Sequence, residues 1–376
     1  MFTKSDISRN ELQLVRGQAK CGYDWWWHSL TAKNAKTGEE KPFYIEFFAC
    51  NPALAQDKPV FGKTDKSAKP SYVMVNVGAW GKDNKKQLHR FYPWKDVKFA
   101  KKAPITIDCG ECFMSETETH GKVVVTEKDE EALGIGMSDA GSIEWNIRIE
   151  KKIPYNVGYG AGKLFRTLQL FEMFWHVEGM KTLYEGEIIL DGERYIVEKE
   201  GSFGYADKNW GKNFTSPWVW LSSCDLTSKK TGKKLENSAF DIGGGRPKVG
   251  PLVLNRKLLS AFCYEGQRFE FNFSKFWTFT RTTFKGWEDE ELIHWHVEQK
   301  TWNNKMVADF TCRKEDMLNI RYEAPTGERR HTRLWNGGNG KGVVSLYRKG
   351  KLVDEILVEH LGCEYGEFDA TEPYAE

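Results

Sequence analysis

Residues 142–150 read Ser-Ile-Glu-Trp-Asn-Ile-Arg-Ile-Glu, with an apolar side chain at every second position. In an extended chain this alternation places Ile143, Trp145, Ile147 and Ile149 on one face and polar side chains on the other. A period of two is typical of a β-strand with one buried face.

Similar segments recur along the whole chain. Turn signals such as Asp191-Gly192 and Tyr264-Glu265-Gly266 separate them, and a helical pattern is confined to Leu164–Trp175. We therefore predict an all-β protein of antiparallel barrels or sandwiches with few short helices. The other predicted strands are Phe43–Cys50, Ser71–Val77, Lys122–Thr126, Leu183–Leu190, Trp218–Cys224, Arg268–Phe273, Glu291–Lys300, Lys305–Cys312 and Val343–Arg348.

The length of 376 residues suggests two domains, at about 150 residues per domain. The glycine-rich stretch Pro154–Lys163 is interpreted as the connector between them. The boundary is therefore predicted near residue 165, with domains at residues 1–165 and 166–376.

Composition excludes several classes of protein. Lys plus Arg number 55 and Asp plus Glu 53, so the net charge of +2 argues against nucleic-acid binding. A mean hydropathy of −0.59 without a long apolar run argues against stable membrane insertion. Residues 1–17 contain no apolar signal segment, and the 8 cysteines are scattered. We therefore predict a cytoplasmic protein with reduced thiols. The sequence does not specify an oligomeric state.

Tryptophan is the unusual component, with 15 residues in the chain. Trp is large and carries a polar N–H group, so such a number requires several cores or an aromatic-lined cavity.

Two segments contain motifs that resemble those of the tocopherol cyclase family. Residues 205–211 read Tyr-Ala-Asp-Lys-Asn-Trp-Gly and precede Trp218-Val-Trp220, which is similar to that family's Glu-Lys-Asn-Trp-Gly motif and Trp-x-Trp strand. The run Gly22–His28 and the turn Asn51-Pro-Ala-Leu54 resemble its N-terminal motifs. The chain departs from the family in having Asp207 in place of Glu and His28 in place of Lys, and in lacking a Gly-Gly-Pro-Trp close.

The resemblance implies two lipocalin-like domains and cofactor-independent cyclisation of a small hydrophobic substrate with a prenyl or polyene chain. In this chemistry a prenyl alkene is protonated and a hydroxyl group closes the ring. The acid must stay neutral until it reacts, which burial of a carboxyl group achieves. Aromatic faces stabilise the cation, and exclusion of water prevents its hydration.

Three carboxyl groups are candidate acids. Asp207 lies within the family-like motif, although it is equally suited to pairing with Lys208 or to a turn. Glu46 lies on the same strand face as the aromatic residues Tyr44 and Phe48. Because a glutamate is rarely buried without a partner or a function, Glu46 is a second candidate acid. Asp24 precedes three tryptophans and is the third candidate. The alternative is that the tryptophans belong to a core and that Asp24 lies at its edge without a catalytic role.

Strand parity divides the tryptophan run, placing Trp25 and Trp27 on one face and Trp26 on the other, with Asp24 and His28. His294 and His296 also share a strand face. They could line a cavity, lie on a solvated surface or bind a metal as a pair. Because no third ligand is evident, we predict no metal. The candidate substrate-binding residues are Trp25, Trp26, Trp27, His28, Phe48, Tyr205, Asn209, Trp210, Trp218, Trp220, His294 and His296.

Two other functions fit the same residues. A carrier of lipids or isoprenoids would use an aromatic cavity without chemistry, and a hydratase would add water to an isoprenoid double bond. The fold alone does not distinguish these functions from a cyclase.

Overall fold

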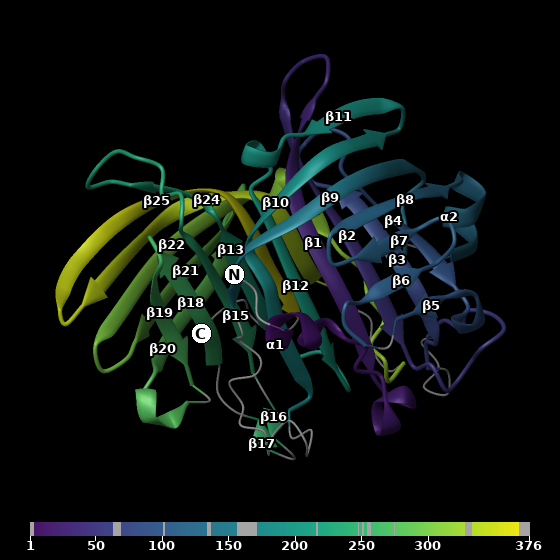
Figure 1. The fold of residues 1–376 in the computed structure, drawn as a ribbon, viewed down its shortest axis with the longest axis horizontal. Coiled ribbons are helices and arrows are strands. Elements are labelled where there is room, and N and C mark those ends of the chain that lie inside the picture. Colours follow the sequence, from purple (N-terminus) through teal and green to yellow (C-terminus); the bar gives the residue numbers. More distant parts are fainter. Residues whose placement is uncertain are drawn as a thin grey trace.

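The computed structural model describes residues 4–62, 69–100, 102–133, 137–155, 171–215, 217–246, 248–249, 252–253, 257–273, 275–327 and 333–367. Strands dominate these residues, in two large curved antiparallel sheets (Figure 1), which confirms the all-β prediction. The α-helices are short: α1 is Lys4–Ile7 and α2 is Glu127–Leu133. Single 3-10 turns occur at Ser8–Asn10, Arg16–Ala19, Trp94–Asp96, Lys199–Gly201, Phe276–Thr278 (η6) and Lys314–Asp316.

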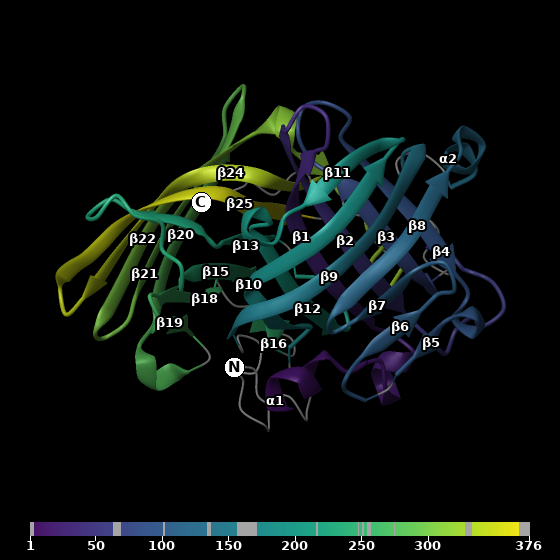
Figure 2. The same ribbon diagram turned by 45° about the horizontal axis from the view of Figure 1, so that its top comes forward.

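The N-terminal sheet has twelve strands in the order β4-β3-β2-β1-β11-β10-β9-β8-β7-β6-β5, with β12 paired to β1 and β10. It curls into a barrel (Figure 2). Its strands are β1 Tyr23–Asn34, β2 Glu40–Cys50, β3 Tyr72–Ala79, β4 Lys86–Tyr92, β5 Lys98–Phe99, β6 Thr106–Asp108, β7 Phe113–Ser115, β8 Glu118–Val125, β9 Gly141–Tyr155, β10 Met173–Leu190, β11 Glu193–Val197 and β12 Gly204–Gly211.

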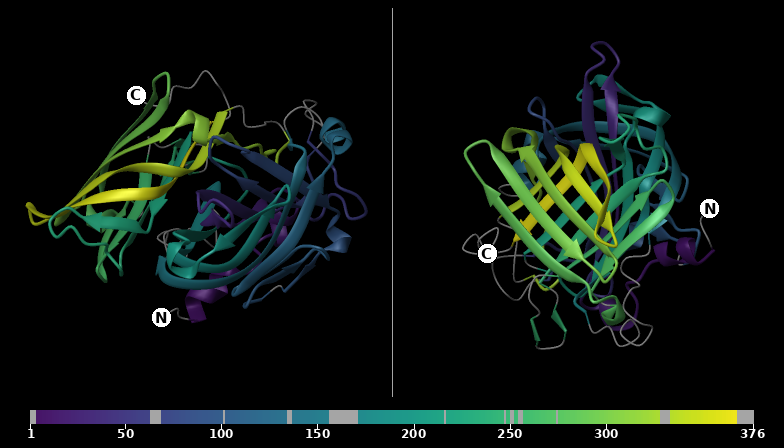
Figure 3. Two further views of the ribbon diagram at one scale, coloured as in Figure 1. Left: turned by 90° about the horizontal axis from the view of Figure 1, so that it is seen from above. Right: turned by 90° about the vertical axis from the view of Figure 1, so that its left-hand side faces the viewer.

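The C-terminal sheet has eleven strands in the order β19-β18-β15-β13-β25-β24-β22-β21-β20, with β14 and β23 attached to β25 and β24. It forms a half-barrel beside the first sheet (Figure 3). Its strands are β13 Trp218–Ser223, β14 Asp225–Ser228, β15 Ala239–Gly245, β18 Lys257–Tyr264, β19 Gln267–Asn272, β20 Arg281–Glu288, β21 Leu292–Lys300, β22 Asn304–Arg313, β23 Leu318–Asn319, β24 Arg333–Arg348 and β25 Lys351–Glu367; β16 Lys248–Val249 and β17 Leu252–Val253 form a separate hairpin.

The chain changes sheets between Gly211 and Trp218. The boundary expected near residue 165 falls outside the described residues, and β10, β11 and β12 beyond it pair with the N-terminal sheet. We therefore propose residues 212–217 as the division between the two units. Local turn signals cannot place it, because sheet membership depends on pairing with strands far away in the sequence.

The helical pattern at Leu164–Trp175 lies partly outside the described residues, and its last three residues, Met173–Trp175, begin β10. The helix is therefore wrong at that end, because the segment pairs with β12. The predicted turn at Asp191-Gly192 is confirmed by positive φ angles of 48° and 84°.

Three apolar cores follow from this arrangement. One fills the N-terminal barrel, one lies against the inner face of the C-terminal sheet, and the third fills the seam between the sheets. Strands β1, β2 and β12 separate the first core from the seam, so both of their faces are buried. A strand buried on both faces needs large side chains at consecutive positions, which explains Trp25–Trp27.

All 8 cysteines are free thiols. Neither α-helix in the described part of the chain has the length and apolar character needed to cross a bilayer.

Candidate active site between the two sheets

A cavity of about 130 Å³ lies in the seam, where β1, β10 and β12 face β13, β15 and β25. Its wall is rich in aromatic side chains and includes two carboxyl groups. The lining residues are Trp25, Trp27, Phe171, Met173, Phe174, Trp175, Asp207, Asn209, Thr215, Trp218, Val219, Trp220, Gly243, Gly244, Gly245, Lys257, Leu259, Phe273, Tyr322, Asn336 and Glu364.

Strand register brings two of the predicted acids to the seam. Trp27 on β1 lies opposite Glu46 on β2 and opposite Asp207 on β12. Because side chains directly opposite one another in a sheet share a face, all three point from the barrel toward the C-terminal sheet.

Asp207 is a buried acid at the cavity wall. Its Oδ2 atom accepts hydrogen bonds from Trp175 Nε1 at 2.6 Å and from the Tyr205 hydroxyl at 3.2 Å. Its Oδ1 atom is buried and has no hydrogen-bond partner among the described residues. Burial raises the pKa of Asp207 to about 8, although the bond from Trp175 favours the ionised form. The carboxyl group is therefore mostly protonated at neutral pH.

The Tyr205 hydroxyl joins Asp207 to a second acid across the seam. It also lies 3.2 Å from Oδ2 of Asp241 on β15, whose Oδ1 accepts a bond from Trp220 Nε1 at 3.1 Å. A phenol has one proton to donate, so one of the two carboxyl groups must itself donate a proton to the phenol oxygen. Burial and the charge of Asp207 raise the pKa of Asp241 well above its usual range, in agreement with this chain of shared protons.

Glu364 on β25 is the second carboxyl group in the cavity wall. It accepts bonds from Trp218 Nε1 at 2.8 Å and Asn336 Nδ2 at 3.0 Å. Burial raises its pKa to about 7, despite these two donors. Such a group is divided between acid and carboxylate at neutral pH, so it is suited to accept a proton.

Glu46 lies behind the cavity wall. Its Oε2 atom accepts bonds from the Tyr322 hydroxyl at 2.8 Å and Asn76 Nδ2 at 2.9 Å, and Tyr322 itself lines the cavity. Burial raises the pKa of Glu46 to about 8. The geometry suits an acid that acts through Tyr322.

Two tryptophans of the wall have indole N–H groups that lack a hydrogen-bond partner among the described residues. The Nε1 atoms of Trp25 and Trp27 are buried without a hydrogen-bond partner in the described part of the chain. An indole nitrogen only donates, so a ligand oxygen that accepts hydrogen bonds would satisfy either group.

Asp24 faces away from this cavity. It forms an ion pair with Lys208 and accepts a bond from the Gln13 backbone N–H at 2.6 Å. The Lys208 ammonium lies 3.8 Å above the ring of Trp26. Burial raises the pKa of Asp24 to about 6, against the attraction of Lys208. The geometry therefore favours a structural ion pair over the acid role considered from sequence.

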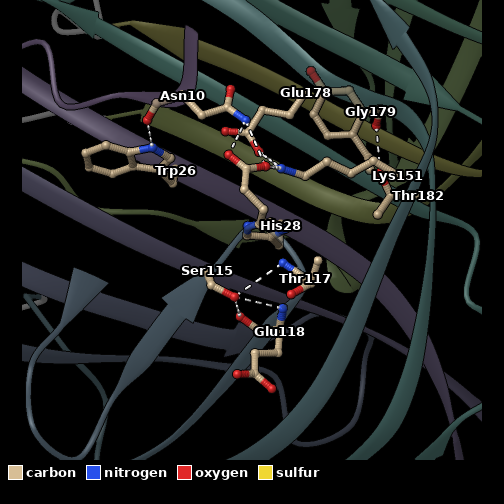
Figure 4. Close-up of polar contacts among 12 residues, drawn as sticks. Asn10, Trp26, His28, Ser115, Thr117, Glu118, Lys151, Glu178, Gly179 and Thr182 are labelled. Carbon is tan, nitrogen blue, oxygen red and sulfur yellow. Dashed lines mark hydrogen bonds and ion pairs between the residues drawn. The ribbon is translucent and has the colours of Figure 1, made fainter. Parts of the chain in front are cut away.

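Figure 4 shows polar contacts around Trp26 and His28, on this second face of β1. Lys151 forms buried ion pairs with Glu116 and Glu178, and Trp26 Nε1 donates to the Asn10 carbonyl at 2.9 Å. His28 bonds the Tyr184 hydroxyl at 2.8 Å, and burial lowers the pKa of His28 to about 3. Trp26 and His28 thus belong to the barrel interior.

The remaining predicted residues divide between the seam and other surfaces. Asn209 lines the cavity and accepts a bond from the Tyr23 hydroxyl at 2.5 Å. Phe48 packs in the seam but is not part of the lining, since Tyr23 and Tyr322 stand beside it. Trp210 is not part of the lining, and its ring stacks on Phe174, which is.

The two histidines of β21 lie on the outer face of the C-terminal sheet. His294 bonds Asp289 at 2.7 Å, and His296 bonds Asp309 at 2.6 Å. Neither lines the cavity, and no cluster of three potential metal ligands occurs among the residues described here.

The residues of the site that were not identified as candidates from sequence include Asp241, Glu364, Trp175 and Tyr322. For Glu364 the sequence signal is the pair of glycines in Gly362-Cys-Glu-Tyr-Gly366. A Cβ atom at Gly362 would lie 2.4 Å from the Trp220 ring, and one at Gly366 would lie 2.7 Å from the Trp218 ring. Glycines on the same face as an acid thus mark where tryptophans pack. Trp175 and Tyr322 have no comparable local signal.

Fold and site together define a lipocalin-like β protein with an acidic, aromatic cavity between two sheets. The chain belongs to the tocopherol cyclase-like family, whose sequence profile matches residues 70–366. A search of curated proteins finds no match.

Solved structures with a similar fold include three with low sequence identity. The putative AttH of Nitrosomonas europaea has 12% identity over 92% of this chain and 93% of its own, with a TM-score of 0.42. Kievitone hydratase of Nectria haematococca has 12% identity over 96% of each chain, with a TM-score of 0.49. CghA, solved with Sch210972, has 10% identity over 93% of this chain and 90% of its own, with a TM-score of 0.49.

Proposed function

We propose that this protein catalyses a cofactor-independent, acid-initiated cyclisation of a neutral hydrophobic substrate that carries an alkene and a hydroxyl group. The environment of Asp207 carries the proposal. The group lines an aromatic cavity and is mostly neutral near pH 7, and its buried Oδ1 atom has no partner in the described part of the chain. A protonated oxygen in such a setting is free to give its proton to a ligand.

The reaction balances without an oxidant or added water. Asp207 transfers its proton to one alkene carbon, which leaves a cation on the neighbouring carbon. The substrate hydroxyl oxygen bonds to that cation, and its proton passes to a carboxylate of the wall. Glu364 is suited to this acceptance, and proton exchange restores Asp207, so the product is an isomer of the substrate.

The aromatic wall supports both steps. Trp25 and Trp27 lie on one side of the cavity and Trp218 and Trp220 on the other, where indole faces stabilise a cation. A substrate hydroxyl or carbonyl oxygen can accept hydrogen bonds from the indole N–H groups of Trp25 and Trp27. These bonds would orient the substrate in the cavity. The three raised pKa values at Asp207, Asp241 and Glu364 disfavour an anionic ligand.

Incubation with a prenylated phenol in heavy water tests the proposal, with mass analysis of the product. A cyclase leaves one deuterium on carbon without adding oxygen. A hydratase adds oxygen as well, and a carrier returns the ligand unaltered. Product isomers that form equally fast with the Asp207→Asn variant would contradict the assignment of the acid.

A further inference from the structure

One end of the C-terminal sheet exposes a group of aromatic side chains that no core absorbs. Trp302, in the turn between β21 and β22, is 82% exposed, Phe279 is 67% exposed and Trp277 is 61% exposed. The rings of Phe279 and Trp302 lie 6.3 Å apart. We name these three residues the aromatic tip. Its exposure is costly in water, so it marks an interaction surface.

Basic residues surround the aromatic tip. Arg281 and Lys300 lie opposite one another on β20 and β21, directly behind Phe279 and Trp302. The turn between β24 and β25 adds Lys349 and Lys351, and the Lys349 backbone N–H bonds the Asn303 carbonyl at 2.7 Å. We name these four exposed residues the basic rim.

The charge of the basic rim is not balanced locally. The neighbouring Lys305 and Lys275 have ion pairs with Glu298 and Glu270. For the four rim residues, the described part of the chain offers no ion pair. The chain as a whole has a net charge of only +2, so this end is a concentrated positive site.

The three turns meet at one end of the molecule. In Figure 1 the β24–β25 turn, the β21–β22 turn and η6 lie at the left-hand end, which faces the reader in the right-hand view of Figure 3. Phe273, which lines the cavity, directly follows β19 and precedes Trp277 by four residues. The aromatic tip thus begins four residues after the cavity wall in the sequence.

We propose that the aromatic tip and basic rim bind the surface of a lipid bilayer that contains anionic headgroups. Trp prefers the interface between headgroups and acyl chains, and Lys and Arg are drawn to the negative surface. This docking is peripheral and requires no spanning segment. It would bring the cavity to the phase in which an apolar ligand dissolves, whatever reaction follows.

Co-sedimentation with vesicles tests the proposal on the full chain. We expect binding to phosphatidylcholine vesicles that contain phosphatidylglycerol, and at least tenfold weaker binding to phosphatidylcholine alone. The Arg281→Gln/Lys300→Gln variant should bind about thirtyfold less tightly, at about fivefold for each basic residue. The Phe279→Ala/Trp302→Ala variant should lose binding even at low salt.

Trp287→Ala is the matched control, since Trp287 is 45% exposed at the opposite end of β20 and stacks on His294. It should bind as the wild type does, and the melting temperature of each variant checks folding. Absence of wild-type binding to both vesicles, or binding that survives loss of the aromatic tip, would overturn the proposal. Self-association that Trp302→Ala abolishes would overturn it too, by assigning the tip to a protein interface. Asp207→Asn should bind vesicles normally, so this test is independent of the proposed reaction.

Discussion

The buried acids on the two faces of β1 have opposite kinds of partner. On the barrel face, Asp24 is matched by the Lys208 ammonium, which also lies against Trp26. On the seam face, Asp207 and Glu46 flank Trp27 and have only neutral hydrogen-bond donors. A charge on the first face is compensated, whereas a charge on the second is not. Burial without a counter-ion is what keeps a carboxyl group protonated and reactive.

The largest effect is expected for Asp207→Asn. Loss of the acid should lower the turnover of a prenylated phenol by about 10²–10⁴-fold, the usual contribution of general acid catalysis. The free energy of unfolding should be unchanged or higher, because the variant removes a group that is costly to ionise. Activity and urea unfolding measured on the same sample check both statements. Lower stability with unchanged turnover would place Asp207 with the structural acids.

Asp24→Asn should do the reverse. Lys208 would be left buried without its partner, and breaking such a pair costs about 3–5 kcal/mol of unfolding free energy. Urea unfolding measures this loss. The double variant Asp24→Asn/Lys208→Met is the control, since removal of both charges should recover most of the stability. If Asp24→Asn were stable and inactive, the contrast between the two faces would be wrong.

Gly243→Ala probes how the seam face positions its acid. A Cβ atom there would lie 2.4 Å from the Trp175 ring, whose Nε1 atom holds Asp207. The expected loss is about 1–3 kcal/mol of stability, with a further loss of turnover as Trp175 moves. Gly17→Ala is the matched control, because a Cβ atom at Gly17 meets nothing within 4 Å. Equal turnover in both variants would show that Trp175 does not position the acid.

The pH dependence gives the smallest effect when it is measured over a single pH unit. The pKa of Asp207 is about 8 in the folded protein, above that of an unfolded aspartate, so the folded state retains a proton that the unfolded state loses. Its contribution to stability is therefore complete in acid and declines between about pH 4 and pH 8, by at most about 1.4 kcal/mol per pH unit. Urea unfolding should show a shallower decline for Asp207→Asn, and turnover should fall above about pH 8. Identical slopes in wild type and variant would contradict the raised pKa.

Sequence reasoning identified part of the strands and two acids of the seam face. Alternation predicted β9 and β21, and parity separated Trp25 and Trp27 from Trp26. It grouped Asp24 with the candidate acids, since the buried partner Lys208 is 184 residues away. It also placed His294 and His296 among the lining residues, because parity specifies a shared face but not which face meets the cavity.

The amino-acid sequence by itself determined the all-β class, the hairpin turns and the face on which each side chain of a strand lies. These properties follow from a period of two and from residues near one another in the chain. Only the tertiary structure decided which faces enclose the cavity. It brought Asp241 and Glu364 of the second sheet to Asp207 of the first, and joined Glu46 to Tyr322. The physical reason is that a pKa depends on solvent exclusion and on partners from distant strands, which local patterns do not record.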